Sequence, residues 1–314
     1  MLGKLLKYDF RSMWKQFSVI WPAALILAFI NRFTVFGIHN PGGSVFGEWM
    51  GVVSMGLFGG VCFTMVILSA VFVLTRFYKG LLGDEGYLMH TLPVTRTSQF
   101  FTHFLSGFGL LTAGNLLIFL LSALAMMPSG SVDWAALGLW LLVTELLELF
   151  FLSLGTLCAM ATGWLLAIPV LYGAANCIVL LVCVVVQFLQ RWFYFGFEST
   201  TFPMAVIWLT PIARLSTAVC GYADVLVPRE GEEVYLRVLP EGGMTSLLVY
   251  TIVGLALLAL GWLLYRRRPS EAAGDAIAFR WLRPIVRWTV GLCGGLGLGP
   301  VSYTHLTLPT KLEV

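Results

Sequence analysis

The chain contains no Lys or Arg between Thr97 and Gln190. A soluble protein needs basic side chains on the surface of a segment this long, since charged residues make up about 25% of an ordinary soluble domain. Here 11% of the residues are charged, 59% are apolar, and the mean hydropathy is +0.88. These values exclude a disordered chain and indicate a polytopic membrane protein, whose external loops carry few cations.

Six apolar stretches are long enough to cross a bilayer. A hydrocarbon core of about 30 Å requires about 20 apolar residues in a helix. The stretches cover residues 17–36, 51–75, 101–127, 134–161, 164–189 and 244–265. We therefore expect an all-α fold with six transmembrane helices that form one domain over residues 17–265.

The cations that flank these stretches set the predicted orientation. Lys and Arg residues precede the first stretch, lie between the second and the third, and follow the sixth as Arg266, Arg267 and Arg268. Because cytoplasmic loops carry an excess of Lys and Arg, six spans place all three groups in the cytoplasm. The loop 76–100 is then cytoplasmic, and the loop 191–243 is extracellular.

The extracellular loop is expected to have structure of its own. Its apolar run at 202–220 is interrupted by Pro203, Pro211 and Arg214. A full span there would move the later Arg cluster outside the cell, so we expect a re-entrant or interfacial helix covered by protein or lining a water-filled cavity. Residues 224–240 alternate like a short β-hairpin with its turn at residues 228–231.

Residues 1–16 have the pattern of an amphipathic helix. Apolar side chains can share one helical face, while cations recur every three or four residues on another. The cations predicted to contact anionic headgroups of the inner leaflet are Lys4, Lys7, Arg11 and Lys15. The alternative is a basic flank without a surface helix.

Two acidic residues interrupt the fourth apolar stretch. Glu145 and Glu148 are three residues apart and therefore share a helical face. Carboxylates in hydrocarbon are costly unless they are neutralised or paired, so this pair either lines a translocation path or packs as protonated side chains. The partners weighed for the second interpretation are Asn115, Asn176, Gln187 and a neighbouring subunit.

Small residues spaced by four indicate where helices approach closely. Gly155, Ala159 and Gly163 form one such row, and Gly56 and Gly60 form another. Rows of this kind allow close backbone contact between membrane helices. We expect them to serve packing within the chain rather than dimerisation.

Motifs for chemistry are missing from the sequence. There is no Gly-x-x-x-x-Gly-Lys-[Ser/Thr] phosphate loop, no His-Glu-x-x-His zinc pair and no Gly-x-Ser-x-Gly elbow. We expect no catalytic residue, metal site or cofactor in this chain. The cytoplasmic loop 76–100 mixes apolar anchors with charges, which fits docking on a partner protein or apolar side chains resting on the membrane.

Three segments resemble the permease subunits of type-2 ABC exporters from Gram-positive bacteria. They are residues 1–10, 76–93 and 265–274, and the likeness extends over roughly residues 1–290. The resemblance implies a six-span unit in the bacterial plasma membrane with a cytoplasmic N-terminus. It also implies an N-terminal amphipathic elbow helix, a coupling helix in the first cytoplasmic loop, and re-entrant elements between the fifth and sixth spans.

The resemblance also implies partners for this chain. A second permease subunit pairs with it as a homo- or heterodimer, and two copies of a separate ATPase bind ATP and Mg²⁺; no nucleic acid is involved. The role of contacting the ATPase falls on Gly83, Asp84, Glu85, Gly86, Tyr87, Leu88, Met89, Leu92 and Pro93. The cargo stays open, since an apolar, weakly acidic path fits lipids, peptides or amphipathic drugs.

The expected function is therefore the membrane subunit of an ATP-driven exporter. One alternative is a non-transporting membrane sensor or scaffold. Another is an intramembrane enzyme that uses Glu145 and Glu148, although no His lies at mid-membrane positions to assist them.

The C-terminal part is expected to differ from the rest. Residues 266–300 are predicted to form a cytoplasmic segment and the start of a truncated seventh span. The string Val301–Thr310 reads like a translated sequencing-library adapter. We therefore expect residues 301–314 to be an artefact rather than native protein.

Overall fold

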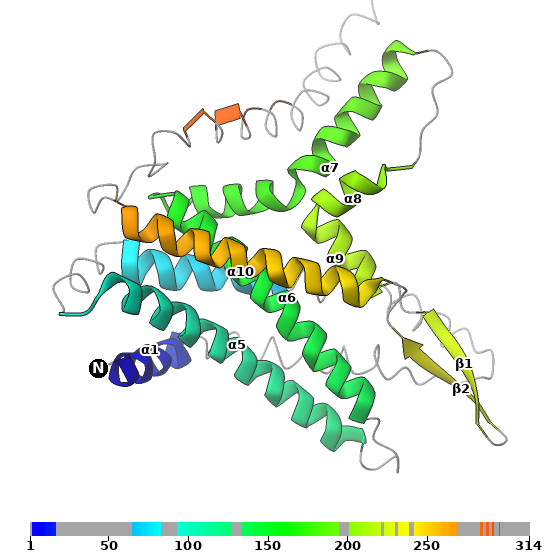
Figure 1. The fold of residues 1–314 in the computed structure, drawn as a ribbon, viewed down its shortest axis with the longest axis horizontal. Helices are drawn as coiled ribbons and strands as arrows, with labels where there is room; N and C mark the ends of the chain where they lie inside the picture. Colours follow the sequence, from blue (N-terminus) through cyan, green and yellow to red (C-terminus); the bar gives the residue numbers. More distant parts are fainter. Residues whose placement is uncertain are drawn as a thin grey trace, which may run out of the picture.

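The computed structural model describes most of the chain from residue 65 to residue 268, together with the N-terminal helix. The described ranges are 2–16, 65–82, 93–126, 134–194, 201–220, 223–229, 232–238 and 242–268, with isolated positions between 283 and 295. The predicted first span, and the predicted artefact at 301–314, lie outside these ranges. Regular structure within them is helical apart from one β-hairpin (Figure 1).

Four of the helices that the structure describes are long and apolar enough to cross a membrane. They are α5 (Arg96–Met126), α6 (Trp134–Ala161), α7 (Ala167–Phe193) and α10 (Gly243–Arg267). They correspond to the third to sixth predicted spans, and α6 has the predicted bounds. Six spans are not shown, because the first lies outside the described residues and the second is described only from Met65.

Helix α5 begins before the apolar stretch predicted at 101–127. The helix begins at Arg96 rather than at residue 101. Thr95 explains the earlier start, since its Oγ1 accepts a hydrogen bond from the Ser98 amide at 3.3 Å and its carbonyl accepts one from the Gln99 amide at 3.1 Å. A threonine in this position caps the free amides of a first helical turn.

The second predicted span ends in an unusual helix. Residues 65–72 are α-helical and continue directly into the π-helix η2 (Val73–Leu82), beyond the predicted end at residue 75. Thr75 Oγ1 donates to the carbonyl oxygen of Val71 at 2.9 Å, within the junction. π-helical turns are rare and are frequent at functional sites.

Helix α10 lies along α6 at a seam of glycines. A Cβ on Gly254 would be 3.0 Å from Phe150 Cα, and one on Gly261 would be 3.6 Å from Leu157 Cα. Gly155 of α6 faces η2, where a Cβ would be 2.9 Å from Val73 Cγ2. The structure thus shows close packing at Gly155, one member of the predicted row, and a glycine seam on α10 that was not predicted. The predicted row Gly56 and Gly60 lies outside the described residues.

An aromatic core joins η2, α5 and α10 near Arg96. Phe77 and Phe100 have ring centroids 6.0 Å apart, and Phe100 and Tyr265 have centroids 5.8 Å apart. All three side chains are buried. Helix α1 (Leu2–Gln16) packs beside the same end of α5 (Figure 1).

The predicted extracellular loop contains short elements. The run at 202–220 forms α8 (Met204–Leu209) and α9 (Pro211–Cys220), and the Tyr250 hydroxyl of α10 donates to the Trp208 carbonyl oxygen. The hairpin consists of β1 (Ala223–Arg229) and β2 (Glu232–Val238). The hairpin was predicted, but its turn is shorter than expected because residues 228 and 229 belong to β1.

Candidate functional site

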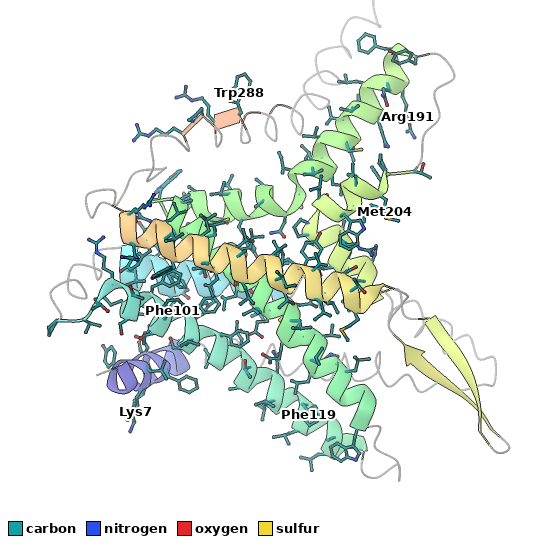
Figure 2. The ribbon with its side chains drawn as sticks, in the orientation of Figure 1. Lys7, Phe101, Phe119, Arg191, Met204 and Trp288 are labelled. Atoms are coloured by element: carbon teal, nitrogen blue, oxygen red, sulfur yellow. The ribbon has the colours of Figure 1, made fainter. Side chains whose placement is uncertain are left out.

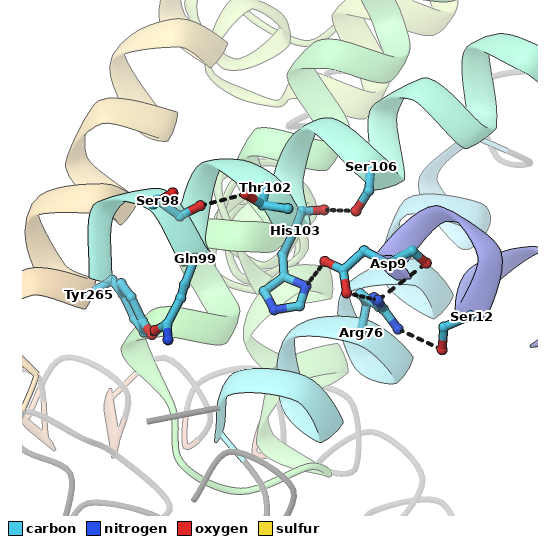
Figure 3. Close-up of polar contacts among 9 residues, drawn as sticks. All are labelled: Asp9, Ser12, Arg76, Ser98, Gln99, Thr102, His103, Ser106 and Tyr265. Atoms are coloured by element: carbon cyan, nitrogen blue, oxygen red, sulfur yellow. Dashed lines mark hydrogen bonds and ion pairs between the residues drawn. The ribbon is translucent and has the colours of Figure 1, made fainter. Parts of the chain in front are cut away.

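Asp9 lies on the face of α1 that packs against the helix bundle and is fully buried. Arg76 of η2 donates from Nη2 to Asp9 Oδ1 in a buried ion pair, and it reaches the Asp9 carbonyl oxygen at 3.3 Å. His103 of α5 approaches the other carboxylate oxygen, with 2.6 Å between Nδ1 and Oδ2. Figure 3 shows the three side chains converging from three elements. We call Asp9, Arg76 and His103 the inner cluster.

The inner cluster holds three elements together through one carboxylate. Arg76 Nη1 also lies 3.4 Å from Ser12 Oγ, which extends the contact by one turn of α1. A buried ion pair contributes little net stability, because desolvation offsets the attraction. Removing one partner nevertheless costs about 3–5 kcal/mol, since an uncompensated charge stays buried. The cluster therefore fixes α1 against η2 and α5.

Helix η2 connects the inner cluster to the predicted coupling loop. It ends at Leu82, immediately before Gly83. Phe77, next to Arg76, is fully buried, and its ring lies 6.3 Å from that of Phe72. The segment that enters the loop is thus held by an ion pair and by aromatic packing.

Arg268 closes a second polar network where α6 and α10 end. Its Nη1 donates to the carbonyl oxygens of Ala159, Met160 and Thr162 at 3.4, 3.1 and 2.8 Å. Carbonyls at the end of a helix lack partners within the helix and carry partial negative charge. Arg96 Nη1 donates to the Arg268 carbonyl oxygen at 3.0 Å. Burial lowers the pKa of Arg268 to about 10, so this cap stays charged at neutral pH.

The acidic pair of α6 is hydrogen-bonded to α5. Asn115 Nδ2 lies 3.1 Å from Glu145 Oε1 and 2.7 Å from Glu148 Oε2. Thr112 Oγ1 donates to Glu145 Oε2 at 2.8 Å. Glu148 is fully buried, whereas Glu145 is partly exposed. We call Thr112, Asn115, Glu145 and Glu148 the mid-span cluster.

Of the three side chains considered as partners of Glu145 and Glu148, one is hydrogen-bonded to them in the structure. Asn115 contacts both glutamates. Asn176 Nδ2 instead donates to the Tyr172 carbonyl oxygen at 2.9 Å, and Gln187 Nε2 donates to the Thr201 carbonyl oxygen at 3.2 Å. Both lie on α7, which directs their amides to its own backbone and to the chain that follows it.

The remaining predicted site residues are described only in part. Pro93 is exposed just before α5, and the other predicted coupling residues, between 83 and 92, lie outside the described residues. Lys7 and Arg11 are exposed on α1, and Figure 2 shows Lys7 pointing away from the bundle. The side chains of Lys4 and Lys15 are not described, although both residues belong to α1.

The inner cluster was not predicted, although the sequence carries a signal for it. The apolar face of α1 includes Leu2, Leu5, Leu6 and Met13, and Asp9 falls on the same face. An acidic residue at an apolar position of an amphipathic helix requires a buried partner. His103 and Arg76 give no comparable signal, because polar residues near span ends often face water.

No set of three or more His, Cys, Asp or Glu side chains that could hold a metal ion occurs in the part of the chain that the structure describes. Comparison with known proteins adds no assignment: no protein-family model matches the chain, and no curated protein matches it.

Proposed function

We propose that this chain is the membrane-spanning permease subunit of an ATP-driven ABC exporter in the bacterial plasma membrane. It forms the substrate path together with a second permease subunit, in a homo- or heterodimer. Two copies of a separate ATPase supply the ATP and Mg²⁺ chemistry. The observation that carries this proposal is the inner cluster, in which buried Asp9 joins α1 to the helix that enters the loop at 83–92.

A permease without its own ATPase must receive movement from another protein at its cytoplasmic surface. The chain has no phosphate-loop motif. Coupling between distant parts of a protein is carried by packed side chains and by polar networks. Arg76 and Phe77 provide both kinds of contact on the segment next to the loop.

The proposed movement starts at the loop. Closure of the ATPase pair displaces residues 83–93, and η2 carries this displacement through Arg76 to Asp9 and His103. Helices α1 and α5 then shift together, and the spans alternate between inward-open and outward-open arrangements by rigid-body motion. With the N-terminus in the cytoplasm, Lys7 and Arg11 lie at the inner leaflet, where anionic headgroups attract cations.

Co-purification with candidate ABC ATPase subunits from the source organism tests the proposal. The tagged full chain should retain the ATPase in detergent and stimulate ATP hydrolysis in nanodiscs. The Asp84→Asn/Glu85→Gln variant should weaken both, because it removes the charges of the predicted docking loop. The matched control Glu232→Gln/Glu233→Gln removes two charges from strand β2 and should leave both unchanged. Association and stimulation that survive deletion of residues 80–95 would contradict the proposal.

A further inference from the structure

We propose that the mid-span cluster is a binding site for one organic cation, an ammonium group carried on an apolar body. The juxtaposition that supports it is the pair Glu145 and Glu148 on α6 facing Asn115 and Thr112 on α5. The inference rests on the proposed function only where it identifies the bound cation as the class of substrate that the exporter transports. Binding itself requires only this chain.

The two glutamates of the mid-span cluster have no cationic partner among the described residues. Both glutamates accept hydrogen bonds from the same Asn115 nitrogen, so the two carboxylates lie close together. The ion pairs found among the described residues involve Asp9 and neither glutamate. Two adjacent carboxylates in a low-dielectric interior require a compensating positive charge. No described cationic side chain pairs with either glutamate, and a bound proton or a cationic ligand would supply the compensating charge.

One carboxylate oxygen of Glu148 lacks a hydrogen-bond donor among the described residues. Glu148 has no exposed surface, and its Oε1 has no hydrogen-bond partner within the described ranges. A buried acceptor without a donor is unfavourable, so the cluster is incomplete in this state. An ammonium group supplies both the missing donor and the missing charge through a short N⁺–H···O⁻ hydrogen bond.

The described donor set does not fit Ca²⁺ or Mg²⁺ as the ligand. Ca²⁺ and Mg²⁺ take about six or more oxygen ligands. The cluster offers two carboxylates, and Asn115 directs its NH₂ group rather than its carbonyl oxygen toward them. An ammonium group has three donors and needs few acceptors, which matches this geometry.

The surroundings indicate that the cation has an apolar body. Glu145 is the partly exposed member of the pair. The exposed Leu142 precedes it by three residues and therefore lies on the same face of α6. With a rise of 1.5 Å per residue, Glu148 lies about 15 Å from Gly138 along α6, near the middle of a bilayer. A cation at this depth needs apolar surface to offset desolvation.

Direct binding to the purified full chain tests the site. The protein is placed in nanodiscs of phosphatidylcholine, which has no net charge, without any ATPase. The probe is dansylcadaverine, a fluorescent primary ammonium, and its neutral N-acetyl derivative is the matched probe. Fluorescence anisotropy should show saturable binding of the ammonium only. Glu145→Gln/Glu148→Gln should weaken it roughly tenfold or more, the effect of losing one charge-assisted hydrogen bond.

The control variant is Glu232→Gln/Glu233→Gln, which removes the same charge elsewhere and should bind like the wild type. Equal binding of the ammonium to both double variants, or equal binding of the acetylated probe to the wild type, would overturn the proposal. Loss of ATPase coupling leaves these results unchanged, so failure of the site and failure of the proposed function can be distinguished.

A measurement on the wild type covers the case in which the glutamine variant does not fold. Dicyclohexylcarbodiimide modifies buried carboxyl groups, and mass spectrometry locates the adduct. Modification of Glu145 or Glu148 should fall severalfold with the N,N-dimethyl derivative of dansylcadaverine, a tertiary ammonium that keeps one N–H donor and forms no amide with an activated carboxyl group. It should not change with the acetylated probe. Modification without protection by the ammonium would show that the pair holds a proton only, which contradicts the proposal.

Discussion

The imidazole of His103 on α5 meets the carboxylate of Asp9 on α1, with 2.6 Å between Nδ1 and Oδ2. Both side chains are fully buried. Arg76 approaches the same carboxylate from η2. One acidic side chain of α1 therefore contacts both η2 and α5 and holds the N-terminal helix against them.

Replacing Asp9 with Asn should lower the stability of the protein by about 3–5 kcal/mol, because Arg76 would remain buried without its counterion. Thermal unfolding in detergent, followed by tryptophan fluorescence, measures the change. The double variant Asp9→Asn/Arg76→Met should be more stable than Asp9→Asn alone, since the buried cation is removed as well. Lys7→Gln, on the exposed face of the same helix, is the control. Equal melting temperatures for Asp9→Asn and Lys7→Gln would show that the ion pair does not hold α1.

Gly107→Ala should destabilise the contact between α5 and the end of the second predicted span. A Cβ at this position would overlap the ring of Phe72, so the ring must move at a cost of about 1–3 kcal/mol. Gly109→Ala on the same helix meets nothing within 4 Å and should be neutral or stabilising by up to about 1 kcal/mol, because Ala favours helix over Gly. Gly107→Ala should therefore melt at a lower temperature than Gly109→Ala. The reverse order of melting temperatures would contradict the prediction.

Arg268→Ala should loosen the last turn of α6. The variant removes the donor of three hydrogen bonds to the end of that helix. Hydrogen exchange of the amides at 156–161, measured by mass spectrometry, should become faster because the helix end opens locally. Arg267→Ala removes a neighbouring exposed charge and should leave the exchange unchanged. Identical exchange in both variants would argue against the cap.

Asn115→Leu should destabilise the protein strongly, because both glutamates lose their shared donor. The same substitution in a Glu148→Gln background should cost less, since one charge has been removed. A double-mutant cycle between positions 115 and 148 should therefore show a coupling energy above about 1 kcal/mol. Thr112→Val should have a smaller effect, as its acceptor Glu145 is partly exposed. Additive effects at 115 and 148 would mean that the two side chains act independently.

The orientation of the chain can be tested at the hairpin. An epitope inserted between Glu230 and Gly231 should bind antibody in intact cells, because six spans place this turn outside. An epitope at the N-terminus should bind only after the membrane is permeabilised. Reversed accessibility would exclude the proposed docking of a cytoplasmic ATPase at residues 83–93.

Hydropathy predicted the bounds of α6 from the sequence because the bilayer sets the length of a spanning helix. Alternation of side chains likewise predicted the hairpin at β1 and β2. The placement of the cluster Arg266–Arg268 predicted that the run at 202–220 would not form a full span, and the structure has two short helices there. Each of these features depends on composition along the chain.

Features that depend on pairing between distant elements were not predictable in the same way. The burial of Asp9 requires both Arg76 and His103, and no local pattern assigns these partners to one another. The π-helical winding of η2 leaves the apolar composition of the segment unchanged, so hydropathy cannot detect it. For Glu145 and Glu148, the sequence offered three hydrogen-bonding side chains, and only the packing of α5 on α6 selects Asn115.

The inner cluster also has a consequence for the order of events during synthesis. Asp9 is translated first, but its partners follow at positions 76 and 103. Until both have left the ribosome, the carboxylate has no counterion within the protein and must remain hydrated. The contacts that α1 makes in this structure can therefore form only after residues 76 and 103 have been synthesised. Because His103 lies on α5, an early helix in the chain is completed by a contact with an element made much later.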